Sequence, residues 1–205
     1  MSTDLSDIYN HRFRDMLIPL VEPLEKFIKE CLLGEKRIDR ICVRAKSVER
    51  FLSKAQKYDD NGEIKYSDPI NQIQDQLGAR IVTFYMDDVD RIAEIVERYF
   101  RPIEKQCIVP DSEREFSYFG QHFILLIPPD ILDGGLSIDE VPDFFELQIK
   151  TLYQHAWAEA NHDLGYKPNK ELSADEKRRI AFTSAQSWGA DMIFNELYKS
   201  SAKDN

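Results

Sequence analysis

Hydrophobic residues near the start of the chain recur with the spacing of a helix. Between residues 17 and 31 they lie three or four positions apart, although Pro19 and Pro23 interrupt the run. A proline inside a helix lacks the N–H that the preceding turn needs, so the pattern predicts either two short helices or one kinked helix. Residues 40–46 then alternate between apolar and polar positions, which predicts a half-buried strand with Arg44 and Lys46 on its polar face.

The rest of the chain switches between helical and β-rich segments. Ser47 predicts the start of a helix that reaches about Tyr58, and residues 78–86 predict a strand followed by an amphipathic helix capped at Asp87–Asp88. Further strands are predicted near residues 103–109, 121–127 and 144–151. Two long helices follow, and the last begins with a capping box at Ser173. Together these elements predict one compact α+β domain.

Composition limits the class of protein. A chain of 205 residues can bury a large core without disulfides or metals, and no stretch reaches the roughly eighteen apolar residues of a membrane span. The first residues lack the basic start and apolar core of a signal peptide, so we expect a soluble, cytoplasmic protein with no membrane partner. The three widely spaced cysteines, Cys31, Cys42 and Cys107, are expected to be reduced thiols.

The charge of the chain excludes one class of function. Its net charge of −10 argues against a protein that coats nucleic acid non-specifically, because phosphate neutralisation needs clustered Lys and Arg. A local basic pocket remains compatible with this charge.

The segment from residue 144 to residue 167 carries the most chemical information. In a strand, Glu146, Gln148 and Lys150 share one face, while the hydrophobic residues between them point into the core. An acid, an amide and a base therefore line one polar surface. Taken alone, the pattern is more typical of a solvated strand face with a surface ion pair than of a functional site.

The wider motif resembles the RelA/SpoT synthetase domain. Glu-Leu-Gln-Ile-Lys-Thr at residues 146–151 is followed by Gln-His-Ala-Trp-Ala-Glu at 154–159 and His-Asp-Leu-Gly-Tyr-Lys at 162–167. The family's other landmarks occur in its order. They are Arg44-Ala-Lys46 with Lys54 downstream, Asp75-Gln-Leu-Gly-Ala-Arg80, and Tyr118-Phe-Gly-Gln-His122. The resemblance covers roughly residues 40–167.

This resemblance implies a fold and an activity. It implies an α+β fold with a mixed β-sheet of the nucleotidyltransferase type, flanked by N- and C-terminal helices. The N-terminal helices would occupy residues 1–38, the synthetase core 39–168, and the C-terminal helix and a frayed tail 169–205, all in one compact domain. The implied activity moves the β,γ-pyrophosphate of ATP to the 3′-hydroxyl of an acceptor, with Mg²⁺ as cofactor.

The resemblance also implies roles for individual residues. Asp75 and Glu146 match the pair that binds the metal, and Glu146 would accept the proton of the attacking hydroxyl, either directly or late in a reaction activated by the metal. The ATP-binding residues would be Arg44 and Arg80 on the adenine and Lys46 and Lys54 on the phosphates. The acceptor side would be formed by Tyr118, which stacks on the base, and by His122, Gln148, Lys150 and His155. Judged singly, each of these residues also fits an ordinary structural position.

The match departs from the family on the acceptor side. Residues 107–117 contain the acidic Asp111, Glu113 and Glu115, and Arg114 is their only basic residue. Such charges repel a free di- or triphosphate unless they turn away. In addition, Phe119 and Gly120 replace the family's Arg and Ser, and Arg50 replaces a serine.

Three functions therefore remain open. The first is a GTP pyrophosphokinase-like enzyme that makes guanosine tetraphosphate. The second is a toxin that pyrophosphorylates the 3′ CCA end of tRNA, which implies an antitoxin partner and a basic docking patch. Candidates for that patch are Lys26, Lys29, Lys36, Arg37 and Arg40. The third is an inactive nucleotide-binding regulator, and the terminal helices could equally pair with a second subunit of a homo-oligomer. Alarmone hydrolysis is excluded, since His162–Asp163 alone supplies too few metal ligands.

Overall fold

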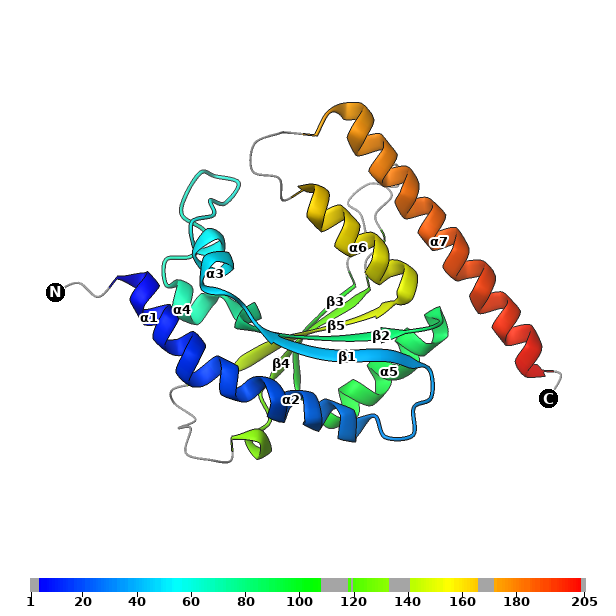
Figure 1. Ribbon diagram of the computed structural model, residues 1–205, viewed down its shortest axis with the longest axis horizontal. Coiled ribbons are helices and arrows are strands. Elements are labelled where there is room, and N and C mark those ends of the chain that lie inside the picture. Colours follow the sequence, from blue (N-terminus) through cyan, green and yellow to red (C-terminus); the bar gives the residue numbers. More distant parts are fainter. Residues whose placement is uncertain (1–3, 108–117, 119, 133–140, 166–171, 204–205) are drawn as a thin grey trace.

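The computed structural model describes residues 4–107, 118, 120–132, 141–165 and 172–203 of the chain. A five-stranded sheet with the order β1-β2-β5-β4-β3 forms its centre (Figure 1). The strands are β1 (Ile38–Ala45), β2 (Leu77–Thr83), β3 (Pro102–Cys107), β4 (Gln121–Leu126) and β5 (Phe144–Thr151). β2 and β5 pair in parallel and the other neighbours pair antiparallel, so the sheet is mixed, as expected.

Helices surround this sheet. They are α1 (Leu5–Arg12), the π-helical turn η1 (Phe13–Leu17), α2 (Ile18–Cys31), α3 (Val48–Ala55), α4 (Pro69–Gln72), the 3-10 turns η2 (Gln74–Gln76) and η3 (Pro129–Ile131), α5 (Met86–Tyr99), α6 (Leu152–Gly165) and α7 (Ala174–Lys203). Among the described residues, no helix combines the length and the hydrophobicity that a membrane crossing requires.

The N-terminal helices are continuous rather than two separate short helices. α1 leads directly into the π-helical turn, whose end residues keep helical dihedral angles, and α2 then contains Pro23 in its interior. A π-helical turn is a common site of bending, so the predicted interruption is realised as this turn just before Pro19.

The two faces of the sheet have different partners. α2 and α5 cover one face, and the main hydrophobic core lies between them and the strands. In the view of Figure 1, α6 lies above the sheet and α7 runs along its right-hand side. The face toward α6 carries most of the polar side chains predicted to act in chemistry.

The helix starts agree with the sequence except at α5. Ser47 and Ser173 cap α3 and α7, and Ser173 and Glu176 form the reciprocal bonds of a capping box. α5 begins two to three residues earlier than predicted, with Tyr85 at its N-cap, so Asp87 and Asp88 lie in its first turn. Acidic residues there interact favourably with the helix dipole without capping the helix.

Candidate active site

β5 presents a polar face over a fully buried hydrophobic one. Phe145, Leu147 and Ile149 are completely buried in the main core, and the residues between them point to the opposite face. The predicted grouping of Glu146, Gln148 and Lys150 on one face is therefore present. Lys150 is only 4% exposed, which sets it apart from an ordinary surface lysine.

Parallel pairing of β2 with β5 brings the two predicted metal-binding carboxylates together. Glu146 lies opposite Gly78 in this pairing. Asp75 belongs to the short η2 turn, three residues before Gly78. Both carboxylates line one small cavity of about 160 Å³, together with Arg44, Lys46 and other residues.

Two lysines hold Asp75 in its ionised form. Lys46 Nζ donates a hydrogen bond to Asp75 Oδ2 at 2.7 Å, and Lys54 Nζ forms an ion pair with Oδ1 at 3.0 Å. Burial by itself raises the pKa of the Asp75 carboxyl, but the two ammonium groups outweigh it and leave the pKa below its usual value. Asp75 is thus a charged carboxylate held between the two lysines predicted to contact phosphates.

Glu146 faces His122 on the neighbouring strand. Its Oε1 lies 3.4 Å from His122 Nδ1, and the β4–β5 register places His122 opposite Gln148. Burial raises the pKa of the Glu146 carboxyl, while His122 and Gln148 lower it by more, so the net shift is downward. His122 Nε2 and Gln148 Oε1 are buried and have no hydrogen-bond partner among the described residues. Two unused polar groups therefore adjoin the carboxylate.

The predicted ATP-binding arginines lie on adjacent strands and line a common cavity. Arg80 Nη1 donates to Glu159 Oε1 at 2.5 Å and lies 3.2 Å from His155 Nδ1, both on α6. Burial, and then the Arg80 charge, lower the pKa of the His155 imidazole. His155 thus contacts the predicted ATP side, whereas the resemblance had grouped it with the acceptor residues.

A larger cavity of about 320 Å³ adjoins the carboxylates. Its lining residues are Arg44, Arg50, Arg80, His122, Gln148, Lys150, Ala158, Glu159, Asn161 and His162. Burial, followed by the nearby Arg80 charge, lowers the pKa of Lys150 to about 8. Sequence reasoning missed Glu159 and Asn161, although the i,i+4 spacing of His155 and Glu159 on a helix was a usable signal.

Tyr118 is placed apart from the other predicted acceptor residues. Its side chain is 7% exposed, its hydroxyl donates to Asp191 Oδ2 at 2.7 Å, and it lines neither cavity. Gly120 nearby touches β5 so closely that a Cβ there would lie 2.1 Å from the Ile149 carbonyl oxygen.

Some predicted features lie outside the described residues. These are the acidic segment 108–117 with Arg114, residue Phe119, the side chain of Cys107, and the last two residues, Tyr166 and Lys167, of the motif at 162–167. Cys31 and Cys42 are free cysteines, as expected.

The carboxylate pair suits Mg²⁺ better than a metal with an all-protein cage. Across the described ranges, no group of three or more His, Cys, Asp or Glu side chains could hold a metal. Mg²⁺ is typically bound through one or two carboxylates, with substrate phosphates and waters completing the octahedron. Asp75 and Glu146, lining one cavity, match that donor set.

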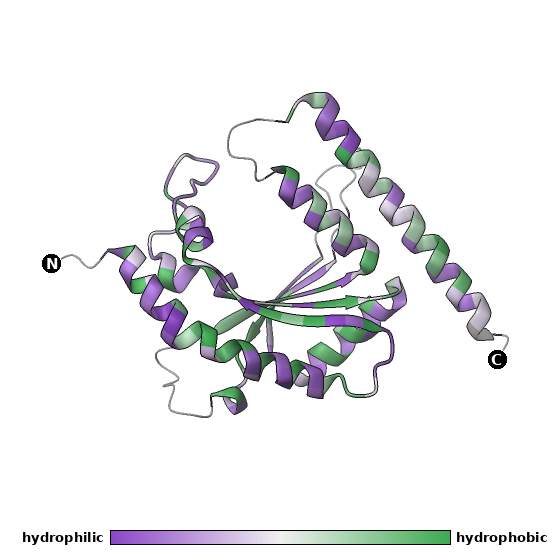
Figure 2. Ribbon diagram, viewed as in Figure 1, coloured by the Kyte–Doolittle hydropathy of each residue, from purple (hydrophilic) through white to green (hydrophobic). Residues whose placement is uncertain are grey.

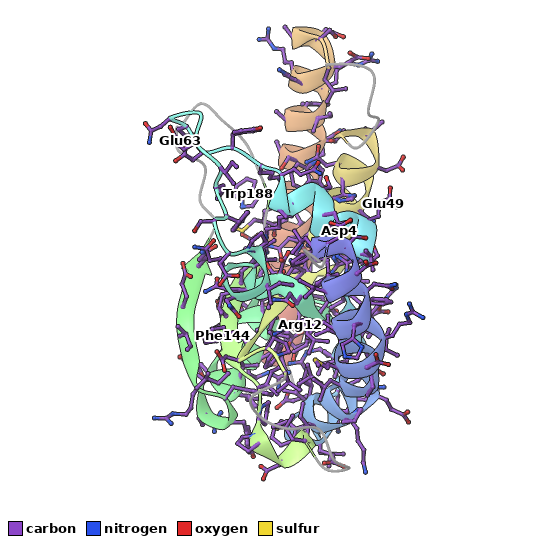
Figure 3. All side chains as sticks on the ribbon, turned by 90° about the vertical axis from the view of Figure 1, so that its left-hand side faces the viewer. Asp4, Arg12, Glu49, Glu63, Phe144 and Trp188 are labelled. Atoms are coloured by element: carbon purple, nitrogen blue, oxygen red, sulfur yellow. The ribbon has the colours of Figure 1, made fainter. Side chains whose placement is uncertain are left out.

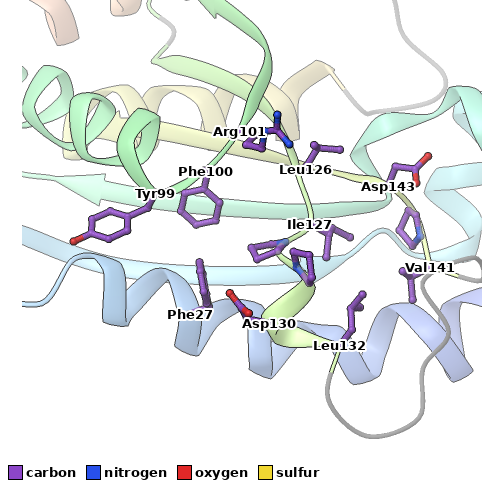
Figure 4. Close-up of a pocket in the computed structure, with 13 residues that line it drawn as sticks. Phe27, Tyr99, Phe100, Arg101, Leu126, Ile127, Asp130, Leu132, Val141 and Asp143 are labelled. Atoms are coloured by element: carbon purple, nitrogen blue, oxygen red, sulfur yellow. The ribbon is translucent and has the colours of Figure 1, made fainter.

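A third cavity lies away from this chemistry. It measures about 380 Å³ and is lined mainly by hydrophobic side chains from α2, the end of α5 and the chain after β4 (Figure 4). Phe27, Phe100 and Leu132 lie around it, and only Arg101, Asp130 and Asp143 carry charge. It contains none of the predicted site residues and lacks the cations that a polyphosphate requires.

A mixed sheet whose polar face gathers two carboxylates, lysines and arginines around a cavity supplies the groups that an enzyme of phosphoryl transfer requires. The chain belongs to the RelA/SpoT family, since the model described as "Region found in RelA / SpoT proteins" matches residues 43–171. It is 25% identical over 165 residues to the GTP pyrophosphokinase YjbM of Bacillus subtilis, covering 78% of this chain and 72% of the relative.

Solved structures share the fold. A GTP pyrophosphokinase family protein from Streptococcus pneumoniae matches with a TM-score of 0.75 and 20% identity, covering 98% of this chain and 97% of that one. Small alarmone synthetase 1 from Bacillus subtilis, bound to its product pppGpp, matches with a TM-score of 0.71 and 23% identity, covering 93% and 98%. The family and fold class expected from the sequence are thereby confirmed, and the similarity to YjbM supports the expected enzyme class, a pyrophosphokinase.

Proposed function

We propose that this protein transfers the β,γ-pyrophosphate of ATP to the 3′-hydroxyl of a guanosine nucleotide. The observation that carries the proposal is the placement of Asp75 and Glu146 in one cavity by the parallel pairing of β2 and β5. Family membership and the similarity to a GTP pyrophosphokinase support the guanosine acceptor.

Different residues of the site would bind the metal, the phosphates and the adenine. Asp75 and Glu146 would hold Mg²⁺, which when bound supplies positive charge against the phosphates. Lys46 and Lys54 already lie within 3.0 Å of Asp75 and would contact the polyphosphate from the same side. Arg44 and Arg80 present flat guanidinium groups that can stack on the two faces of adenine.

The transfer step needs a nucleophile in line and a place for its proton. The 3′-oxygen forms a bond to the β-phosphorus, the bond from that phosphorus to the oxygen bridging it to the α-phosphorus breaks, and AMP leaves with the electron pair. The hydroxyl proton passes to Glu146. Because the pKa of Glu146 is lowered, it is a weak base and accepts the proton late in the transfer.

The acceptor side supplies hydrogen bonds and charge. His122 Nε2 and Gln148 Oε1, buried without partners among the described residues, can bond to the acceptor's hydroxyl and ribose. Lys150 and Arg50 line the same cavity and supply positive charge for the transferred phosphates. Glu146 lies between these groups and the ATP side.

The experiment is transfer of label from γ-³²P-ATP with Mg²⁺ to GDP, GTP or deacylated tRNA, offered in parallel. We expect label on the guanosine nucleotides, and a loss of at least about 100-fold in Glu146→Gln, the low end for removing a proton-transfer group. Glu94→Gln, a matched change on the exposed side of α5, should retain full activity.

Each other outcome contradicts part of the proposal. Label on tRNA alone would replace the guanosine acceptor by an RNA 3′ end, which the acidic residues between 107 and 117 would favour. No transfer to any acceptor, with ATP still bound, would instead identify a nucleotide-binding regulator.

A further inference from the structure

The side of α7 that faces the protein is unusually polar. Ser184, Asp191 and Asn195 are buried on this helix, whereas Phe182 is 64% exposed and Leu197 is also exposed. Figure 2 shows hydrophobic and hydrophilic residues mixed along its whole length. Burying polar groups costs free energy unless each finds a partner, so the buried face of α7 is expected to make specific bonds.

Asp191 makes the shortest of these bonds. Its Oδ2 accepts hydrogen bonds from the Tyr118 hydroxyl at 2.7 Å and from Thr151 Oγ1 at 2.5 Å. Thr151 Oγ1 in turn accepts from the backbone N–H of Gln154 at 3.0 Å, at the start of α6. One carboxylate therefore ties α7 to Tyr118 and to the residue directly after Lys150.

Asp191 is poorly compensated apart from these two donors. Its side chain is 1% exposed, and its Oδ1 has no hydrogen-bond partner in the described part of the chain. No cation forms an ion pair with it among those residues. The carboxylate therefore depends on the hydroxyl groups of Tyr118 and Thr151, and each bond it makes is hard to replace.

The Tyr118 ring is buried and shielded from solvent. Together with Val82 and Trp157 it is one of three buried hydrophobic residues outside the main core in the part of the chain that the structure describes. Trp157 packs toward α7, since its Nε1 donates to the Ile180 carbonyl oxygen at 3.4 Å. A ring that is 7% exposed offers no free face to a nucleotide base.

We propose that Asp191 is a positioning residue that controls the acceptor site by holding Tyr118 against α7. This inference rests on the proposed function and on the role that the resemblance to the RelA/SpoT synthetase implies for Tyr118, which is to stack on the acceptor base. The base can stack only after the bond between Tyr118 and Asp191 breaks, so part of the binding free energy of the acceptor is spent on opening this contact. ATP binds on the other side of the site and does not incur that cost.

The decisive variant is Tyr118→Phe, which keeps the ring and removes the hydroxyl. The Tyr118 hydroxyl bonds to Asp191 and also interacts with the side chains of Thr151 and Gln154. We expect the KM for the guanosine acceptor to fall by at least roughly fivefold, the effect of one net hydrogen bond, with kcat and the KM for ATP unchanged. Asp191→Asn should change the acceptor KM in the same direction and by less, because an amide oxygen still accepts from Tyr118. Glu196→Gln, an exposed change on the same helix, is the matched control and should change nothing.

Two further measurements separate this inference from the proposed function. Tyr118→Ala should lose acceptor binding altogether. If it binds the acceptor normally, stacking by Tyr118 is wrong and the inference fails with it. If Tyr118→Ala loses binding and Tyr118→Phe has an unchanged or higher acceptor KM, the function stands and control by Asp191 is overturned.

Hydrogen exchange across residues 184–195 should rise when GDP binds together with a non-hydrolysable ATP analogue. The region includes Trp188, labelled on α7 in Figure 3. Unchanged exchange would also overturn the inference.

Discussion

At the scale of single residues, burial changes what a charged side chain can do. Lys150 follows the alternation of β5 and was predicted on its polar face, yet it is almost fully buried under α6 and beside Arg80. The alternation could be predicted because side chains in a strand have a period of two. Its burial could not, because α6 and Arg80 reach it only after the chain has folded back.

The lowered pKa of Lys150 predicts how the activity depends on pH. Lys150 is charged below its folded-state pKa of about 8, and in the proposed function its charge acts against the phosphates. The kcat/KM for the acceptor should therefore fall as the pH rises through about 8. Lys150→Arg keeps its charge far beyond that pH and should move the alkaline fall upward. A pH profile of kcat/KM for both proteins checks this, and an alkaline limb at the same pH in both would contradict it.

The lowered pKa of Lys150 also affects the free energy of unfolding. The pKa of Lys150 is lower in the folded state than in the unfolded chain, where it is 10.5. Between these values the unfolded chain binds the extra proton. The contribution of this group to the free energy of unfolding therefore rises with pH from about 8 to 10.5, and its burial cost is present in full below 8.

At the scale of elements, the site depends on how closely β4 approaches β5. Gly120 lies just before β4, where a Cβ would be 2.1 Å from the Ile149 carbonyl oxygen and 2.6 Å from Lys150 Cγ. The sequence marked Gly120 only as a departure from the family. The reason for a glycine is the backbone contact across the sheet, which no local pattern reveals.

This contact predicts the effect of Gly120→Ala. The new methyl group must displace the backbone of β5, so we expect a loss of about 1–3 kcal/mol in the free energy of unfolding and a fall in transfer activity as Lys150 moves. Gly189→Ala is the matched control, since no atom lies within 4 Å of its Cβ position. It should stabilise α7 by up to about 1 kcal/mol. Urea unfolding of both variants measures the difference, and equal stability would contradict the prediction.

At the scale of the whole molecule, a cluster of ion pairs around the buried Asp88 links α7 to the core. Arg37, just before β1, donates from Nε to both carboxylate oxygens of Asp88 of α5 at 3.0 Å, and its Nη2 lies 2.8 Å from Asp88 Oδ1. Arg91 also contacts Asp88, at 3.1 Å. The Arg37 guanidinium lies 4.6 Å from the centre of the Tyr198 ring on α7. Tyr198 also stacks on Tyr85, so three distant segments meet at this point.

This cluster predicts a global effect of Asp88→Asn. Removing the charge leaves Arg37 without its counter-ion, while Arg91 keeps its ion pair with Glu35 at 2.7 Å. We therefore expect a loss of about 2 kcal/mol in the free energy of unfolding. α7 should also be less firmly held, and hydrogen exchange near Tyr198 should rise. Asp60→Asn in the exposed loop after α3 is the control. A stability equal to that of the control would show that the cluster contributes little.

The sequence by itself determined the local features of this protein. The alternation of β5, the caps at Ser47 and Ser173, and the motif residues of the RelA/SpoT family are set by neighbours a few positions apart. Only the tertiary structure decided which of these residues meet. Arg80 contacts Glu159 across 79 positions, Tyr118 contacts Asp191 across 73, and the β2–β5 register brings Asp75 to the cavity of Glu146. Such contacts depend on strand order and on how α6 and α7 fold back, which short-range patterns do not encode.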